Sequence, residues 1–103
     1  MLTESEIRHI IAKGEGTRIE FKEAQLGVPD SFYDTVVSFL NKEGGIILLG
    51  LTDDGVVLGL DDANLMQLKQ DIVTSLNNPD VINPPYALPI RDVNYDKHSL
   101  LYL

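Results

Sequence analysis

Residues 43–60 read EGGIILLGLTDDGVVLGL, and this stretch decides the fold. The four aliphatic residues 46–49 follow a pair of glycines, and a short apolar run of this kind is typical of a strand buried on both faces. Asp53, Asp54 and Gly55 then separate this run from a second apolar run. An Asp-Gly pair between two apolar runs favours a tight turn, because glycine accepts a positive φ. We therefore predict a central β-hairpin over residues 45–60.

Three segments around this hairpin have the spacing of apolar residues that is typical of helices. The first, 4–13, begins after Thr3, which opens a capping-box pattern. The second covers about 31–40 and the third about 62–76, and each has one broad apolar face. We therefore expect about three helices packed against the sheet.

Further strands are indicated on both sides of the hairpin. Residues 17–22 read TRIEFK, in which apolar and charged side chains alternate, and this predicts a half-buried strand. Residues 87–93 and 99–103 are predicted as two more strands, joined by a turn at Asp96 and Lys97. The fold class that follows is α/β of the α+β kind, with a mixed, largely antiparallel sheet.

Composition narrows the class of protein. The chain contains no cysteine, which excludes disulfides and thiolate metal sites within it. It has neither an apolar run of about 18 residues nor the apolar segment of a signal peptide, so we expect a cytoplasmic protein. The sequence stops inside the apolar run 99–103. We therefore expect residues 1–103 to be a single domain cut from a longer protein.

The charge distribution bears on possible partners. The formal net charge is −8, which argues against a general nucleic-acid binder. Residues 1–22 nevertheless hold four basic and four acidic residues, whereas the remaining 81 hold four basic and twelve acidic ones. An anionic partner would therefore meet the N-terminal part of the chain. The alternative is that these charges form ordinary solvated surface.

Four carboxylates form the set with the most chemical interest. Glu15 and Glu20 flank the start of one predicted strand, and Asp53 and Asp54 follow the end of another. If these strands are neighbours, the four groups could converge on Mg²⁺ or Mn²⁺, which prefer oxygen ligands. Aspartate in a tight turn and glutamate on an exposed strand need no metal to explain them, however. The sequence requires no cofactor, and its glycine-rich segment lacks the pattern of a phosphate-binding loop or of any evident small-molecule site.

Three stretches resemble, in order and spacing, the pattern of the Schlafen/Alba-like DNA-binding domain family. They are 15–22 (EGTRIEFK), 39–45 (FLNKEGG) and 46–60 (IILLGLTDDGVVLGL). The resemblance spans about residues 13–76, and Lys42 departs from it by replacing a common threonine. It implies a mixed α/β domain, commonly the N-terminal part of bacterial proteins described as transcriptional regulators or as helicase-related.

The function implied first is DNA binding within such a transcriptional regulator, with RNA as the other possible nucleic-acid partner. The cations that would contact phosphates are Lys13, Arg18, Lys22 and Lys42. This function needs no bound cofactor.

Two alternatives stay open. In Schlafen relatives a three-carboxylate site cleaves structured RNA, which implies a Mg²⁺- or Mn²⁺-dependent nuclease. Glu15, Glu20 and Asp53 would then be its catalytic residues and metal ligands, with Asp54 as the other candidate for the third position. The other alternative is an interaction domain that forms a homodimer by pairing an edge strand with that of another copy.

Overall fold

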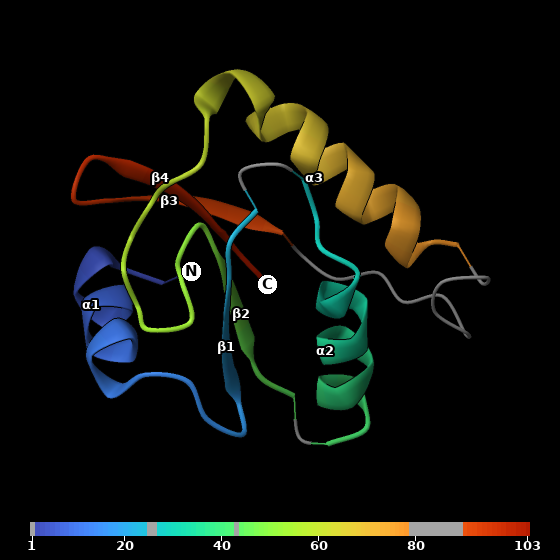
Figure 1. Ribbon diagram of the computed structural model, residues 1–103, viewed down its shortest axis with the longest axis horizontal. Coiled ribbons are helices and arrows are strands. Elements are labelled where there is room, and N and C mark those ends of the chain that lie inside the picture. Colours follow the sequence, from blue (N-terminus) through green and yellow to red (C-terminus); the bar gives the residue numbers. More distant parts are fainter. Residues whose placement is uncertain (1, 25–26, 43, 79–89) are drawn as a thin grey trace.

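The computed structural model describes residues 2–24, 27–42, 44–78 and 90–103. These residues form three helices and four strands: α1 (Glu4–Lys13), β1 (Ile19–Lys22), α2 (Ser31–Leu40), β2 (Ile46–Leu49), α3 (Asp62–Leu76), β3 (Arg91–Tyr95) and β4 (His98–Tyr102). One sheet contains the strands in the order β1-β2-β4-β3 (Figure 1). β1 runs parallel to β2, and the pairs β2–β4 and β3–β4 are antiparallel. The fold is α+β with a mixed, mostly antiparallel sheet, as the sequence predicts.

The predicted hairpin is correct in its turn and needs correction in its returning arm. The chain reverses at Thr52, whose amide donates to the carbonyl of Val56 over 2.9 Å, and Gly55 has the expected positive φ of 86°. Residues 56–58 then make a single antiparallel bridge, between Leu51 and Val57, and form no strand of the sheet. The reason is that β1 and β4 occupy the two sides of β2.

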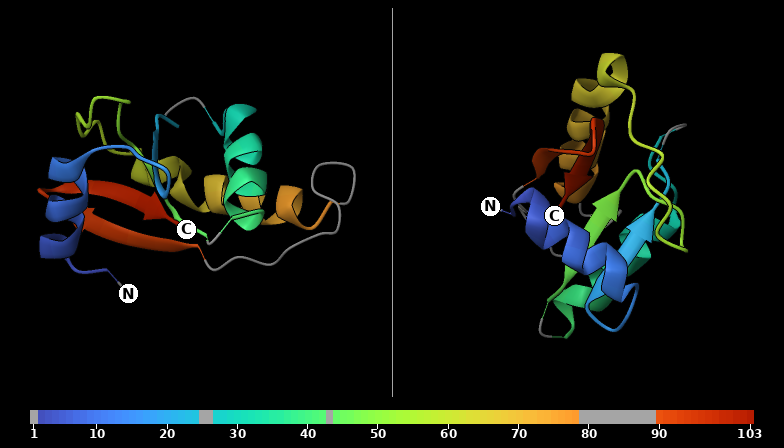
Figure 2. Two further views of the ribbon diagram at one scale, coloured as in Figure 1. Left: turned by 90° about the horizontal axis from the view of Figure 1, so that it is seen from below. Right: turned by 90° about the vertical axis from the view of Figure 1, so that its left-hand side faces the viewer.

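The two faces of the sheet bury separate apolar clusters, because side chains alternate along each strand. On one face Ile47 and Leu49 pack with residues of α2 and α3, and on the other Leu48 packs with Ile7 of α1. Accordingly, α1 covers one face of the sheet, and α2 and α3 cover the other (Figure 2). Within the described ranges, no helix has the length and apolar content to span a membrane.

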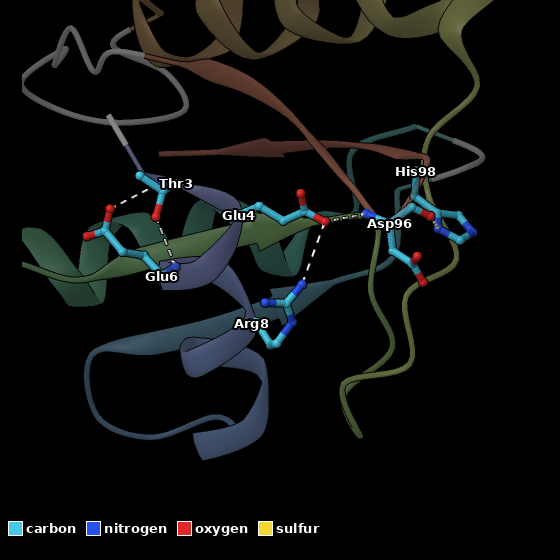
Figure 3. Close-up of polar contacts among 6 residues, drawn as sticks. All are labelled: Thr3, Glu4, Glu6, Arg8, Asp96 and His98. Carbon is cyan, nitrogen blue, oxygen red and sulfur yellow. Dashed lines mark hydrogen bonds and ion pairs between the residues drawn. The ribbon is translucent and has the colours of Figure 1, made fainter.

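Helix α1 has the predicted bounds, and its capping box forms at Thr3. The amide of Glu6 donates to the Thr3 hydroxyl over 3.1 Å, and the Thr3 amide donates to the Glu6 carboxylate over 3.0 Å (Figure 3). Helix α3 begins with a single side-chain cap, since the Asp61 carboxylate accepts from the Ala63 amide over 3.0 Å.

The start of α1 is also fixed to the turn between β3 and β4. Asp96 and Lys97 form this turn with positive φ values of 48° and 66°, at the predicted position. The carboxylate of Glu4 accepts from the Asp96 amide over 3.1 Å and lies 3.8 Å from the Arg8 guanidinium (Figure 3). Arg8 in turn lies over the Tyr95 ring, 5.8 Å from its centroid. Segments from the two ends of the described chain are thereby held together.

Candidate functional site at the two ends of strand β1

Strand β1 lies at one edge of the sheet, and the segment before it folds back along that edge. The carboxylate of Glu15 accepts from the Phe21 amide over 2.9 Å, and the Gly16 amide donates to the Ile19 carbonyl over 3.0 Å. Both Ile19 and Phe21 belong to β1. Because unpaired edge groups invite association with other strands, these two bonds close part of an edge that would otherwise be open.

The same contact brings Glu15 close to two other carboxylates. The pKa of Glu15 is raised above its ordinary value, first by the partial loss of hydration of its carboxylate and then by the charges of Glu20 and Asp53 and a side-chain hydrogen bond with Glu20. The hydrogen bond from Phe21 opposes this increase. The structure therefore places Glu15 beside Glu20, with Asp53 within electrostatic reach.

These carboxylates do not form a ready three-ligand metal site. Across the described ranges, no three or more His, Cys, Asp or Glu side chains are gathered so that they could hold a metal ion. One oxygen of Glu15 binds the strand, and a carboxylate oxygen of Glu20 lies 3.4 Å from the Lys22 ammonium. Asp53 and Asp54 are both exposed in the turn. The donor chemistry suits a hard cation, but the arrangement brings together two carboxylates and not three.

Of the four predicted phosphate-binding cations, Lys22 is separate from the others. It ends β1, and its side chain is mostly buried. Its ammonium donates to the Ser31 hydroxyl over 3.0 Å and pairs with Glu20. These contacts link the end of β1 to the start of α2. The sequence did not reveal this role, because the two residues are brought together by the intervening loop and not by helix or strand spacing.

The three other cations belong to segments near the opposite end of β1. Lys13 ends α1, Arg18 precedes β1, and Lys42 follows α2. The chain segments that carry them lie at one end of the sheet (Figure 1). We call this group, Lys13, Arg18 and Lys42, the cationic end; all three residues are exposed. Glu43, which follows Lys42 in the sequence, lies outside the described residues.

Close packing at Gly45 brings the end of α2 against the start of β1. The amide of Ile46 donates to the Arg18 carbonyl over 2.8 Å and so joins the starts of β1 and β2. A Cβ atom at Gly45 would lie 2.6 Å from the Phe39 ring and 2.8 Å from the Arg18 carbonyl oxygen, closer than atoms pack. The preceding Gly44 lies four residues after the end of α2 and has a φ of 92°, in the left-handed region that favours glycine. The Gly-Gly pair was the available signal for this junction, but only the structure shows which of the two is needed for close packing.

The chain thus forms an α+β domain with a partly closed, carboxylate-bearing edge and a cationic end at the start of β1. The model of the Schlafen, AlbA_2 family matches residues 15–103, and the chain belongs to this family. The fold is similar to a solution NMR structure of the N-terminal domain of an ATP-dependent DNA helicase RecG-related protein from Nitrosomonas europaea. The TM-score is 0.73 at 23% identity, over 100% of this chain and 72% of that chain, which establishes likeness of fold. No curated protein matches the chain.

Proposed function

We propose that this domain binds nucleic acid and that its cationic end contacts the phosphate backbone. The observation that carries the proposal is that the chain segments bearing Lys13, Arg18 and Lys42 lie at one end of the sheet, with all three residues exposed, in a chain of formal charge −8. Membership of the Schlafen, AlbA_2 family supports a nucleic-acid-related role, as does the likeness to a domain of a helicase-related protein. DNA is the partner we put first, and a role in a transcriptional regulator would rest on this binding.

The charge balance defines what such binding would look like. A net charge of −8 repels a polyanion at long range, so attraction must come from short-range contacts at the cationic end. If about three phosphates are neutralised, the plot of log K against log salt has a slope of about −3 for duplex DNA and about −2 for a single strand. We expect a weak complex, with a dissociation constant of roughly 10–100 μM near physiological salt.

The test compares two triple variants that change the net charge equally. One replaces Lys13, Arg18 and Lys42 by glutamine; the control replaces Lys69, Arg91 and Lys97, which lie on α3, on β3 and in the β3–β4 turn. Long-range repulsion increases by the same amount in both, so a difference between them reports local contacts. Fluorescence anisotropy with a labelled duplex, its single strand and an RNA hairpin measures affinity.

We expect the first variant to lose at least about tenfold in affinity and the control to stay within about twofold. Equal losses in the two variants would contradict the assignment of the cationic end. A wild-type protein that binds none of the three probes at about 50 mM salt would contradict nucleic-acid binding itself.

A second candidate function is a nuclease that depends on Mg²⁺ or Mn²⁺. The observation that favours it is the contact between Glu15 and Glu20 with the charge of Asp53 nearby. Because only two carboxylates meet in this structure, we draw no catalytic step through a metal. The measurement is the shift of the thermal midpoint by Mn²⁺, which stabilises a protein that binds it when folded. The shift should vanish in Glu20→Ala and persist in Glu23→Ala, an equal charge change just beyond β1; equal responses exclude the site.

A further inference from the structure

The outer side of β3 is the second edge of the sheet, and its backbone groups can be assigned from the pairing of β4. The amides of Ile47 and Leu103 each donate to the carbonyl of the other, over 3.2 and 3.1 Å. Hydrogen-bonding direction alternates along a strand, so Leu101 and Leu103 face β2 whereas Leu100 and Tyr102 face β3. Their partners in β3 are Val93 and Arg91 respectively.

The other residues of β3 therefore direct their backbone amides and carbonyls away from the sheet. These are Asp92 and Asn94, which lie opposite Leu101 and Ser99 in the non-hydrogen-bonded positions. Among the described residues, no hydrogen bond reaches these outward groups; the contacts of both residues are made by their side chains, with Lys69 and Ser99. Unlike the edge of β1, this edge is not closed by a neighbouring segment within the described ranges.

The side chains of β3 are compatible with a second copy of the same strand in one register. Only registers that place outward groups opposite outward groups can form an antiparallel ladder. When Asp92 lies opposite Asn94 of the second copy, Val93 meets Val93 and Arg91 lies opposite Tyr95. A shift of two residues one way places Asp92 opposite Asp92. The opposite shift places Asp92 opposite Asp96 and Arg91 opposite Lys97, so that like charges meet, which is destabilising.

We propose that two copies of this domain associate through β3, as an antiparallel pair with a two-fold axis at Val93. Asp92 and Asn94 of each copy then form two pairs that each exchange two backbone hydrogen bonds. The interface is isologous, since the same strand contributes to both sides. The partner is a second copy of this chain, because the charges of β3 leave one register in which no like charges lie opposite each other. This association does not rest on nucleic-acid binding.

The first experiment uses cysteine cross-linking, since the chain contains no cysteine. At a non-hydrogen-bonded antiparallel pair the Cα atoms lie about 4.5 Å apart, within the range that a disulfide spans. Val93→Cys should therefore give a disulfide-linked dimer under mild oxidation, with unchanged far-UV circular dichroism. Asp92→Cys is the control, because its counterpart in the second copy is offset by two residues along the strand and lies beyond disulfide reach. Equal cross-linking of both variants, or cross-linking of the control alone, overturns the register.

The second experiment measures association without a cross-link. Asn94→Lys and Asn94→Asp place opposite charges at one position, across from Asp92 of the second copy. Sedimentation equilibrium should show tighter dimers for the lysine variant and a dissociation constant raised roughly tenfold for the aspartate variant, because the substitution acts twice. If the two variants change association in the same direction, the register is wrong. If the wild type stays monomeric up to about 1 mM, a concentration at which even weak complexes form, β3 does not pair with a second copy.

Discussion

The two edges of the sheet differ in the hydrogen bonding of their outward backbone groups. At β1, the preceding segment turns back, and Glu15 and Gly16 bind Phe21 and Ile19 of the strand. At β3, the outward groups have no bond within the described residues. Closing the edge of β1 has a chemical consequence, because it brings Glu15 beside Glu20. The carboxylate pair is thus explained by strand protection alone, and a metal is not needed to account for it.

Proline substitution gives the largest expected effect and tests the difference between inward and outward groups on β3. Val93→Pro removes an amide that bonds β4 and should lower the free energy of unfolding by about 3 kcal/mol or more. Asn94→Pro removes an outward amide and should cost less than about 1 kcal/mol, since proline is tolerated where an edge amide faces solvent. Urea denaturation of dilute, monomeric protein measures both. Similar losses would show that the outward assignment of Asn94 is wrong.

On β1, the corresponding test removes the carboxylate that closes the edge. Glu15→Ala leaves the Phe21 amide without its partner. We expect a loss of about 1 kcal/mol in the free energy of unfolding, because water can reach part of this edge. Glu15→Gln retains an acceptor and should cost less. Glu23→Ala removes an exposed carboxylate just after β1 and serves as the control; a loss as large as that of Glu15→Ala would contradict a specific role for the bond to Phe21.

The parts of the fold that local interactions determine were predicted correctly from the sequence. The capping box at Thr3 fixes α1, and the apolar run of β2 and the turn at Asp96 were placed correctly. The returning arm after Gly55 was not, because its pairing depends on which strands flank β2, and no local pattern encodes the parallel alignment of β1 with β2.

The same distinction applies to the candidate site. The sequence raised the meeting of Glu15 and Glu20 only as a hypothesis, because the fold-back that brings Glu15 onto the edge of β1 has no local sequence pattern. Lys22 has the same sequence signal as Arg18, since both lie on the charged face of 17–22. The loop to α2 brings Ser31 to Lys22 and so distinguishes them. The contacts of each cation therefore depend on how the chain connects its elements, and the pattern of charges in the sequence does not predict these contacts.

A smaller effect is expected at the turn beyond β3, where a second glutamate binds a backbone amide. Glu4→Ala removes the acceptor for Asp96 and the exposed ion pair with Arg8. Because solvent screens both contacts, we expect a loss of roughly 0.5 kcal/mol, below that of Glu15→Ala. Arg8→Ala keeps the bond to Asp96 and removes the ion pair together with the contact over the Tyr95 ring. Thermal unfolding of both variants measures the difference, and an equal loss would assign the effect to Arg8.

The smallest expected effect is the pH dependence that Glu15 gives to stability. Its pKa is raised above 4.5 in the folded protein, first by partial loss of hydration and then by Glu20 and Asp53. The folded state therefore holds a proton that the unfolded chain has released, and stability falls as pH rises through this interval. Relative to Glu15→Gln, the wild type should lose stability from about pH 4.5 upward and level off above the raised pKa.

Glu6 provides a control of opposite sign for this measurement. Its pKa is lowered by hydrogen bonds from the backbone and side chain of Thr3, so its contribution is present above the ordinary glutamate pKa and is lost as pH falls. Urea titrations of Glu15→Gln and Glu6→Gln across the acidic range should therefore deviate from the wild type in opposite directions. If Glu15→Gln follows Glu6→Gln, the bond from Phe21 outweighs both the loss of hydration and the neighbouring carboxylates. The Glu15 carboxylate that closes the edge of β1 would then be stabilised in its ionised form by folding.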